Sequence, residues 1–248
     1  MIDFMMSLLA NTGAIAIVVL ILSITGLIKA RLKWALLSLV LISLYFAALF
    51  MGGQLIPLNQ AFPGLSYNWG GKVSAILLWI VTLVLLLKLR NNFNAAEAGF
   101  TFSQRPGSTV PAAIATILFV AIHIVISLSL SDSSISTTED FLFQMTMPGL
   151  DEEPMFRGIL LYIMSLAIVS SRFNVLGAKI NVAGLLLVVL FGLVHGVMYS
   201  NGEWQFSSFP IMITGAYGFV LLWLRERTGS LVFPIIAHNL VNSSGLLV

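Results

Sequence analysis

The sequence predicts an all-α fold: a polytopic membrane helical bundle of about eight transmembrane helices, forming one integral membrane domain over residues 1–248. The first observation is composition, because 58% of the 248 residues are hydrophobic and only 9% are charged. The second is a mean hydropathy of +1.01, well above the range of water-soluble domains. The third is the repetition of long, continuous apolar segments, which are too long for barrel strands and must be helical because unpaired backbone groups are costly in lipid.

Each predicted span is an apolar segment close to the length of about 20 residues that a helix needs to cross the bilayer core. The spans cover residues 12–28, 34–51, 73–89, 110–130, 154–171, 182–199, 208–224 and 231–247. Turn-rich sequences separate several of them, namely GGQLIPLNQAFPGLSYNWGG, NNFNAAEAGFTFSQRPGS and SDSSISTTED. The first span has no basic segment before it and no cleavage site after it, so we interpret it as a retained anchor.

The fifth span is predicted to begin at Pro154, since proline and preceding acidic residues both suit a first helical turn. An acidic cap is the simplest interpretation of Glu152 and Glu153, but it does not explain Arg157, so we do not adopt it alone. An alternative prediction is that the helix starts earlier. The apolar lead-in FLFQMTMPGL, residues 141–150, would then form an earlier turn of the same helix, and the helix would be broken at Pro148 and Gly149.

Basic residues predict the orientation of the chain, because they concentrate in cytoplasmic loops. With the N-terminus outside, the inner loops contain Lys29, Arg31, Lys33, Lys88, Arg90, Arg105, Arg172, Lys179, Arg225 and Arg227. Lys72 is then an outer loop residue, and Arg157 belongs to a helix. Basic residues scattered in this way reflect topology, so no nucleic-acid partner is expected. We expect a multi-pass protein of a prokaryotic cell membrane.

Polar side chains at membrane depth are functional candidates by default. The sequence contains no cysteine, which excludes disulfides, thiolate nucleophiles and cysteine metal sites. The candidates that remain are Glu152, Glu153, Arg157, His195, His238, Asn242 and His123.

Spacing on a helix predicts which of these side chains share a face. Glu153 precedes Arg157 by four residues, which favours an ion pair, while Glu152 points about 100° away and stays available as a general base. His195 follows Phe191 by four residues, and Asn242 follows His238 by four. A lone membrane histidine more often only bonds a neighbouring helix, and this is the interpretation we adopt for His123.

Three motifs in order, EEPMFR (EExxxR), FGLVH (FxxxH) and HNLVN (HxxxN), carry a family resemblance. Together with TGSLVFPIIAHNLVN they resemble the type II CAAX prenyl endopeptidases, the Abi or CPBP family of intramembrane proteases. The resemblance covers about residues 140–246, which would be the catalytic core, and the first four spans carry no matching motif.

The resemblance implies a role for each motif residue. Glu152 would activate the attacking water, His195 and His238 would bind or polarise at the site, and Asn242 would donate to the oxyanion. Glu153 with Arg157 would fix the helix, with Phe191 supporting His195.

Two mechanisms fit this residue set. No cofactor is predicted if Glu152 activates water alone, whereas Glu152, His195 and His238 could also hold a zinc ion with one position open for water. The sequence lacks the HExxH spacing of many zinc peptidases, so we favour the glutamate mechanism and no metal.

The predicted function is an intramembrane endopeptidase that cleaves a membrane-bound peptide or protein inside the lipid bilayer or at its edge. The resemblance implies prenylated or leader-bearing substrates as candidate classes, and no residue identifies which. A non-catalytic bacteriocin-immunity or scaffold protein of the same fold is the alternative, but it predicts degraded motifs. A transporter or proton relay would also use membrane carboxylates and histidines. It would better suit internal repeats, which the sequence does not show.

Overall fold

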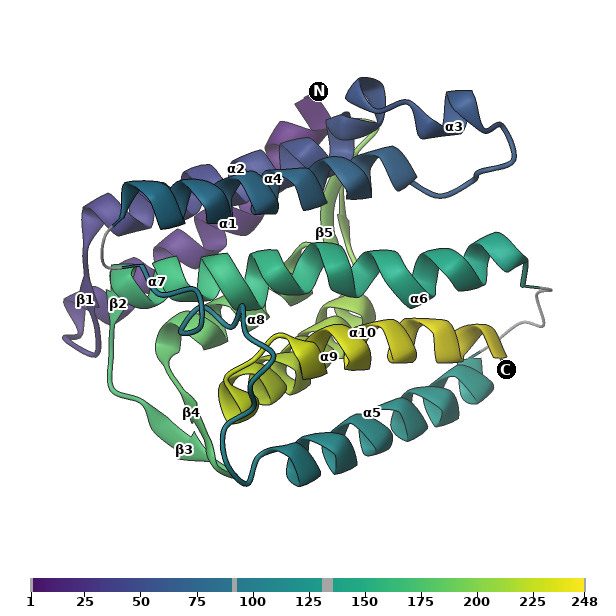
Figure 1. The fold of residues 1–248 in the computed structure, drawn as a ribbon. Helices are drawn as coiled ribbons and strands as arrows, with labels where there is room; N and C mark the ends of the chain where they lie inside the picture. The colour runs from purple at the N-terminus through teal and green to yellow at the C-terminus, as the bar shows by residue number, and fades with distance from the viewer. Residues whose placement is uncertain (1, 91–92, 131–135, 248) are drawn as a thin grey trace. The chain divides into compact units, whose positions relative to one another are not determined.

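The computed structural model describes residues 2–90, 93–130 and 136–247, and over these ranges it confirms the predicted all-α fold (Figure 1). The helices are α1 (Ile2–Ile24), α2 (Leu32–Leu55), α3 (Leu58–Ala61), α4 (Trp69–Leu89), α5 (Thr109–Leu130), α6 (Thr138–Glu153), α7 (Leu161–Ala167), α8 (Val182–Leu193), α9 (Ser208–Thr228) and α10 (Val232–Ser244). A π-helix, η1 (Pro154–Leu160), joins α6 to α7, and a 3-10 helix, η2 (Gly245–Leu247), follows α10.

Short antiparallel ribbons complete the described elements. The pairs are β1 (Lys29–Ala30) with β2 (Ile168–Val169), β3 (Phe173–Val175) with β4 (Ala178–Ile180), and β5 (Val197–Ser200) with β6 (Glu203–Phe206).

Five helices in the described ranges are long and apolar enough to cross a membrane. They are Ile2–Ile24, Leu32–Ala61, Trp69–Leu89, Thr109–Leu130 and Ser208–Thr228. The other three predicted spans correspond to the run from α6 through η1 to α7 and to the shorter apolar helices α8 and α10. Part of the predicted break at 131–140 lies outside the described residues.

The sixth predicted span, 182–199, is wrong at its C-terminal end. Helix α8 stops at Leu193, and the chain then forms the β5–β6 hairpin. Asn201 (φ 54°) and Gly202 (φ 85°) make the turn of this hairpin, and Asn-Gly is a strong signal for such a turn because both residues tolerate positive φ. Apolar composition alone does not reveal this signal.

The first predicted span also begins too late, because α1 starts at Ile2 rather than at residue 12. Polar side chains of α1 form hydrogen bonds with the backbone of β5. The Asn11 amide donates to the Val197 carbonyl at 3.1 Å, and the Tyr199 amide donates to the Ser7 hydroxyl at 2.8 Å. These bonds allow a helix with polar side chains to continue at this depth.

The fifth predicted span is wrong at its start. The helix begins at Thr138, where Thr137 and Asp140 form a capping box, and it passes Pro148 without the predicted break. Glu152 and Glu153 therefore lie at the end of a sixteen-residue α-helix, and they are not an acidic cap. The lead-in residues 141–150 are part of the same helix, as the alternative interpretation proposed.

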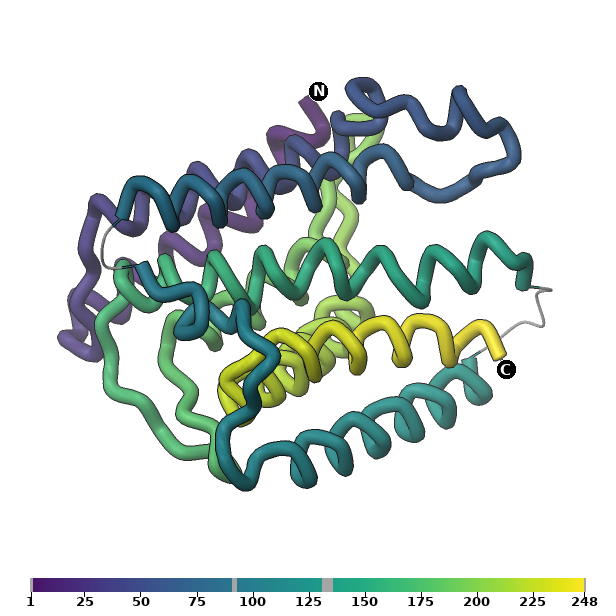
Figure 2. Tube along the Cα trace, in the orientation of Figure 1, coloured from purple at the N-terminus to yellow at the C-terminus, as the bar shows by residue number. Residues whose placement is uncertain are grey.

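Contacts along the chain define two compact units, which we describe separately: the first unit (Met1–Ser43 and Leu160–Trp223) and the second unit (Leu44–Ile159 and Leu224–Val248). In the second unit, α6 lies between α4 and α10, and α10 also contacts α5 (Figures 1 and 2). Gly149 allows the close approach of α10, because a Cβ at this position would lie 2.6 Å from the Ile235 carbonyl oxygen. Its amide donates to Asn239 Oδ1 at 2.7 Å.

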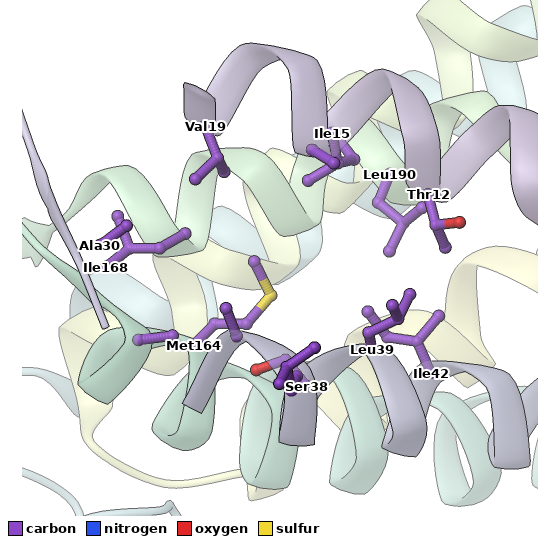
Figure 3. A pocket seen from close by; sticks show the side chains of 14 residues that line it. Thr12, Ile15, Val19, Ala30, Ser38, Leu39, Ile42, Met164, Ile168 and Leu190 are labelled. Atoms are coloured by element: carbon purple, nitrogen blue, oxygen red, sulfur yellow. The ribbon is translucent and has the colours of Figure 1, made fainter. Parts of the chain in front are cut away.

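The first unit contains an apolar cavity of about 220 Å³. Ile15 and Val19 of α1 and Leu39 and Ile42 of α2 lie along two sides, and Met164 extends between them (Figure 3). The cavity lining contains no acid, base or amide side chain. Chemistry that needs to activate water must therefore use side chains elsewhere.

Candidate active site

The charged side chains that could perform such chemistry lie in the second unit, where α6 passes into η1. Pro154 has no backbone N–H, so the Leu150 carbonyl loses its α-helical partner. The indole Nε1 of Trp79, from α4, donates to this oxygen at 3.1 Å. From Pro154 the chain winds as a π-helix, a conformation that is common at functional sites when it interrupts an α-helix.

Glu153 is the centre of the first buried cluster. Its Oε1 accepts from Arg157 Nη1 at 2.9 Å and lies 2.8 Å from His238 Nδ1. The Glu153 side chain is fully buried, and Arg157 is 4% exposed. The ion pair predicted from the four-residue spacing is present, and α10 adds a histidine to it.

The hydrogen bond to Glu153 determines which nitrogen of the neutral His238 ring carries the proton. For Nδ1 to donate to a carboxylate it must carry the ring proton, and in the neutral ring Nε2 is then an acceptor. Glu153 Oε2 is buried and has no hydrogen-bond partner among the described residues. The cluster therefore combines one neutralised carboxylate with an oriented imidazole.

Glu152 belongs to a different cluster, centred on Lys72 of α4. Lys72 Nζ lies 2.7 Å from Glu152 Oε1 and 2.8 Å from Asp151 Oδ2. The Tyr45 hydroxyl, from α2, donates to the same Asp151 oxygen at 3.0 Å. Asp151 is fully buried, whereas the Glu152 side chain is 15% exposed. The two adjacent glutamates thus have different partners and different access to their surroundings.

The loop position predicted for Lys72 is wrong, whereas its predicted place on the outer side stays a prediction. Lys72 lies in the first turn of α4 and is buried, because α4 begins at Trp69. The signal was present in NWGGK, since Asn68 is a favoured N-cap residue and its side chain accepts from the Gly71 amide at 3.0 Å. Asp151 and Tyr45 were not singled out, because no local pattern links them to Lys72.

The third motif places its residues on α10 as the spacing predicted. His238 and Asn242 are one turn apart, and Asn242 is half-buried. The amide that contacts α6 is that of Asn239, which belongs to none of the predicted site residues. Sequence position alone could not distinguish the two asparagines.

His195 belongs to the first unit, in the turn that follows α8. Its Nδ1 lies 2.6 Å from the Phe191 carbonyl oxygen, and the two rings are 4.8 Å apart. The face that these residues share is therefore confirmed, and His195 is exposed. The convergence of His195 with the residues of the second unit stays a prediction.

His123 lies on α5, close to Ser127 and to the end of α10 at Gly245. Its Nε2 is 3.4 Å from the Ser127 hydroxyl. Two helical turns separate Gly245 from His238 along α10. These neighbours agree with the packing role that was predicted for His123.

The donor groups of the second unit do not suit a metal ion as they stand. Arg157 already contacts Glu153 and Lys72 already contacts Glu152, so a cation would have to compete with two fixed positive charges. Among the described residues, no group of three His, Asp or Glu side chains is arranged to hold a metal ion. The choice between glutamate and zinc chemistry stays a prediction.

Comparison with known proteins gave one family match. Residues 135–244 match the family described as type II CAAX prenyl endopeptidase Rce1-like. The match includes both glutamates and the residues of all three motifs. Neither the curated proteins nor the solved structures gave a match to the chain.

Proposed function

We propose that this membrane protein is an intramembrane endopeptidase in which Glu152 activates the attacking water, because residues 135–244 match the family described as type II CAAX prenyl endopeptidase Rce1-like. The substrate is a membrane-bound peptide or protein in contact with the bilayer. Prenylated and leader-bearing peptides are the first classes to test. The apolar helices and the family together support an integral membrane hydrolase.

The observation that carries the proposal is the contrast between the two adjacent carboxylates. Glu153 is fully buried and neutralised by Arg157, so it is suited to holding η1 and α10 together. Glu152 is partly exposed and contacts Lys72, which also contacts Asp151. A general base must reach water, and Glu152 is the glutamate that meets this requirement.

The proposed reaction is the addition of water to a peptide carbonyl. Glu152 takes one proton from the water as its oxygen bonds to the carbonyl carbon, which produces a tetrahedral oxyanion. Asn242 is the candidate to donate to this oxyanion, and the contribution of such preorganised donors is often large. His195 and His238 can donate to it only as protonated imidazoliums, because Nδ1 of each ring already donates to Phe191 or Glu153 and Nε2 of the neutral ring is an acceptor. Collapse of the intermediate breaks the C–N bond, and the proton held by Glu152 passes to the leaving amine. Glu153 positions His238 through Nδ1 throughout.

The experiment is a comparison of membrane peptides with and without active protein. Wild-type protein and Glu152→Gln are reconstituted separately into liposomes with peptides extracted from the membranes of the producing cells. New peptide termini are then identified by mass spectrometry. Termini that appear only with the wild type support the proposal and report the substrate. Identical peptide patterns for both proteins, with both folded, contradict it.

A further inference from the structure

Lys72 lies outside the part of the chain that matches the family, yet it contacts the proposed base. Two glycines precede it, and they bring the start of α4 against the end of α2. A Cβ on Gly70 would clash with the Ile56 carbonyl oxygen, and one on Gly71 with that of Leu49. The approach of these helices fixes the starting point of the lysine side chain.

The ammonium group bridges two carboxylates that are adjacent in sequence. Nζ is 2.8 Å from Asp151 and 2.7 Å from Glu152, and the Tyr45 hydroxyl donates to Asp151. Asp151 is the fully buried partner and has two donors on Oδ2, so it anchors the ammonium. Glu152 is the partner with partial exposure.

This arrangement gives Lys72 two separable effects. The first is structural, because a buried carboxylate that loses its cation is strongly destabilising. The second is geometric, because a reacting group must be held close to its productive position and small displacements cost large factors in rate. An ammonium that bonds one oxygen of Glu152 from a rigid helix restricts the rotation of that carboxylate.

Resting on the proposed role of Glu152, we propose that Lys72 is a positioning residue, which holds the Glu152 carboxylate in place while Asp151 and Tyr45 hold Lys72. The family region alone is then an incomplete site, because α4 supplies the group that orients the base. Removal of Lys72 leaves Asp151 and Glu152 as neighbouring like charges, so Glu152 turns away from its reactive position.

The test separates stability from turnover with four variants. They are Lys72→Met, Asp151→Asn, the double variant Lys72→Met/Asp151→Asn, and Lys88→Met as a control. Lys88 is an exposed lysine in the last turn of the same helix. Each purified protein is assayed for Tm, kcat and KM with a synthetic peptide that spans the bond cleaved by the wild type.

We expect Lys72→Met to lower Tm and to lower kcat by a factor on the order of 10 to 100 with KM within about twofold. The double variant should recover most of the lost Tm, because it removes both partners of the Lys72–Asp151 pair, yet its kcat should stay low. Asp151→Asn should also lower kcat, since Lys72 loses its anchor. Lys88→Met should match the wild type in every measurement.

Two results would overturn the proposal for Lys72: wild-type kcat in Lys72→Met, or recovery of kcat together with Tm in the double variant. The second result would show a role in stability alone. Failure of the proposed function is recognised separately, because the wild-type protein itself would then cleave no membrane peptide.

Discussion

At the scale of single residues, Glu152 and Glu153 have the same chemistry and differ in their surroundings. Glu152 is partly exposed and contacts Lys72. Glu153 is fully buried and contacts Arg157 and His238. We therefore expect changes at the two positions to fail in different ways.

Glu152→Gln should fold normally and lose turnover by a factor on the order of 100 or more, because the amide keeps the size of the side chain but cannot accept a proton from water. Glu153→Ala should lower the free energy of unfolding by about 3 to 5 kcal/mol, because it leaves Arg157 as a buried charge without its carboxylate. Thermal stability and peptide cleavage are measured on the same purified samples. If Glu152→Gln cleaves at the wild-type rate while Glu153→Gln is stable and inactive, the base is Glu153 instead.

Metal dependence is a second prediction at this scale. A chelator should leave cleavage unchanged, because Lys72 already contacts Glu152, the carboxylate that a zinc ion would need. Activity is assayed after dialysis against a chelator, with metal content measured on the same sample. Loss of activity that added zinc restores would establish the zinc alternative with Glu152, His195 and His238.

At the scale of elements, the packing of α6 on α10 depends on a glycine. Gly149→Ala should lower the free energy of unfolding by about 1 to 3 kcal/mol, because its methyl group would meet the Ile235 carbonyl and the Asn239 side chain. Gly13→Ala is the matched control, since a Cβ in that helix meets nothing within 4 Å and alanine favours helix. Equal Tm changes in the two variants would show that the close approach of α10 to Gly149 does not contribute to stability.

The start of α6 carries a second element-scale interaction, which depends on pH. Glu139 accepts hydrogen bonds from the Ser66 and Tyr67 amides and the Trp69 indole. Burial raises the pKa of Glu139, but these hydrogen bonds outweigh it and lower the pKa from 4.5 to about 2. A carboxyl group with a lowered pKa in the folded state stabilises the fold above its unfolded pKa, and this contribution disappears as the pH falls from 4.5 toward about 2.

Glu139→Gln should therefore have a lower Tm than the wild type near neutral pH, and the gap should narrow on acidification through this range. The measurement is Tm against pH for both proteins in the same detergent. A Tm difference that is constant with pH would mean that the charge of Glu139 does not stabilise its contacts with Ser66, Tyr67 and Trp69.

At the scale of the whole molecule, the orientation of the chain in the membrane stays a prediction from its basic residues. The β1–β2 pair brings residues 29–30 beside 168–169, so the basic residues Lys29 and Arg31 lie at this end of the first unit. The start of α1 bonds the β5–β6 hairpin at the other end. A concentration of basic residues at one end is typical of the cytoplasmic side.

Reporter fusions after Lys33 and after Gly64 should consequently report opposite sides of the membrane, with Lys33 inside and the N-terminus outside. Lys33 is at the start of the apolar segment Leu32–Ala61, which is long enough to cross, and Gly64 follows its end. A reporter active only in the cytoplasm, paired with one active only outside, measures this. The same side for both fusions would contradict a crossing by α2.

The sequence by itself determined the features that depend on composition or on spacing along one helix. Apolar length predicted a helical membrane protein, and four-residue spacing predicted the Glu153–Arg157 pair. Three motifs predicted a resemblance to the family whose model matches residues 135–244. Local chemistry also defined the β5–β6 turn, although hydropathy concealed it. Such features are readable because the interacting groups are neighbours in the chain.

Only the tertiary structure decided which distant side chains meet. Lys72 and Tyr45 reach Asp151 and Glu152 because α2, α4 and α6 pack together in the second unit. Helix α6 continues past Pro148, although proline removes a helical hydrogen bond. These outcomes depend on long-range packing and on the burial of charge, which in most proteins outweigh local preference. The partners of the proposed base therefore could not be read from its own motif.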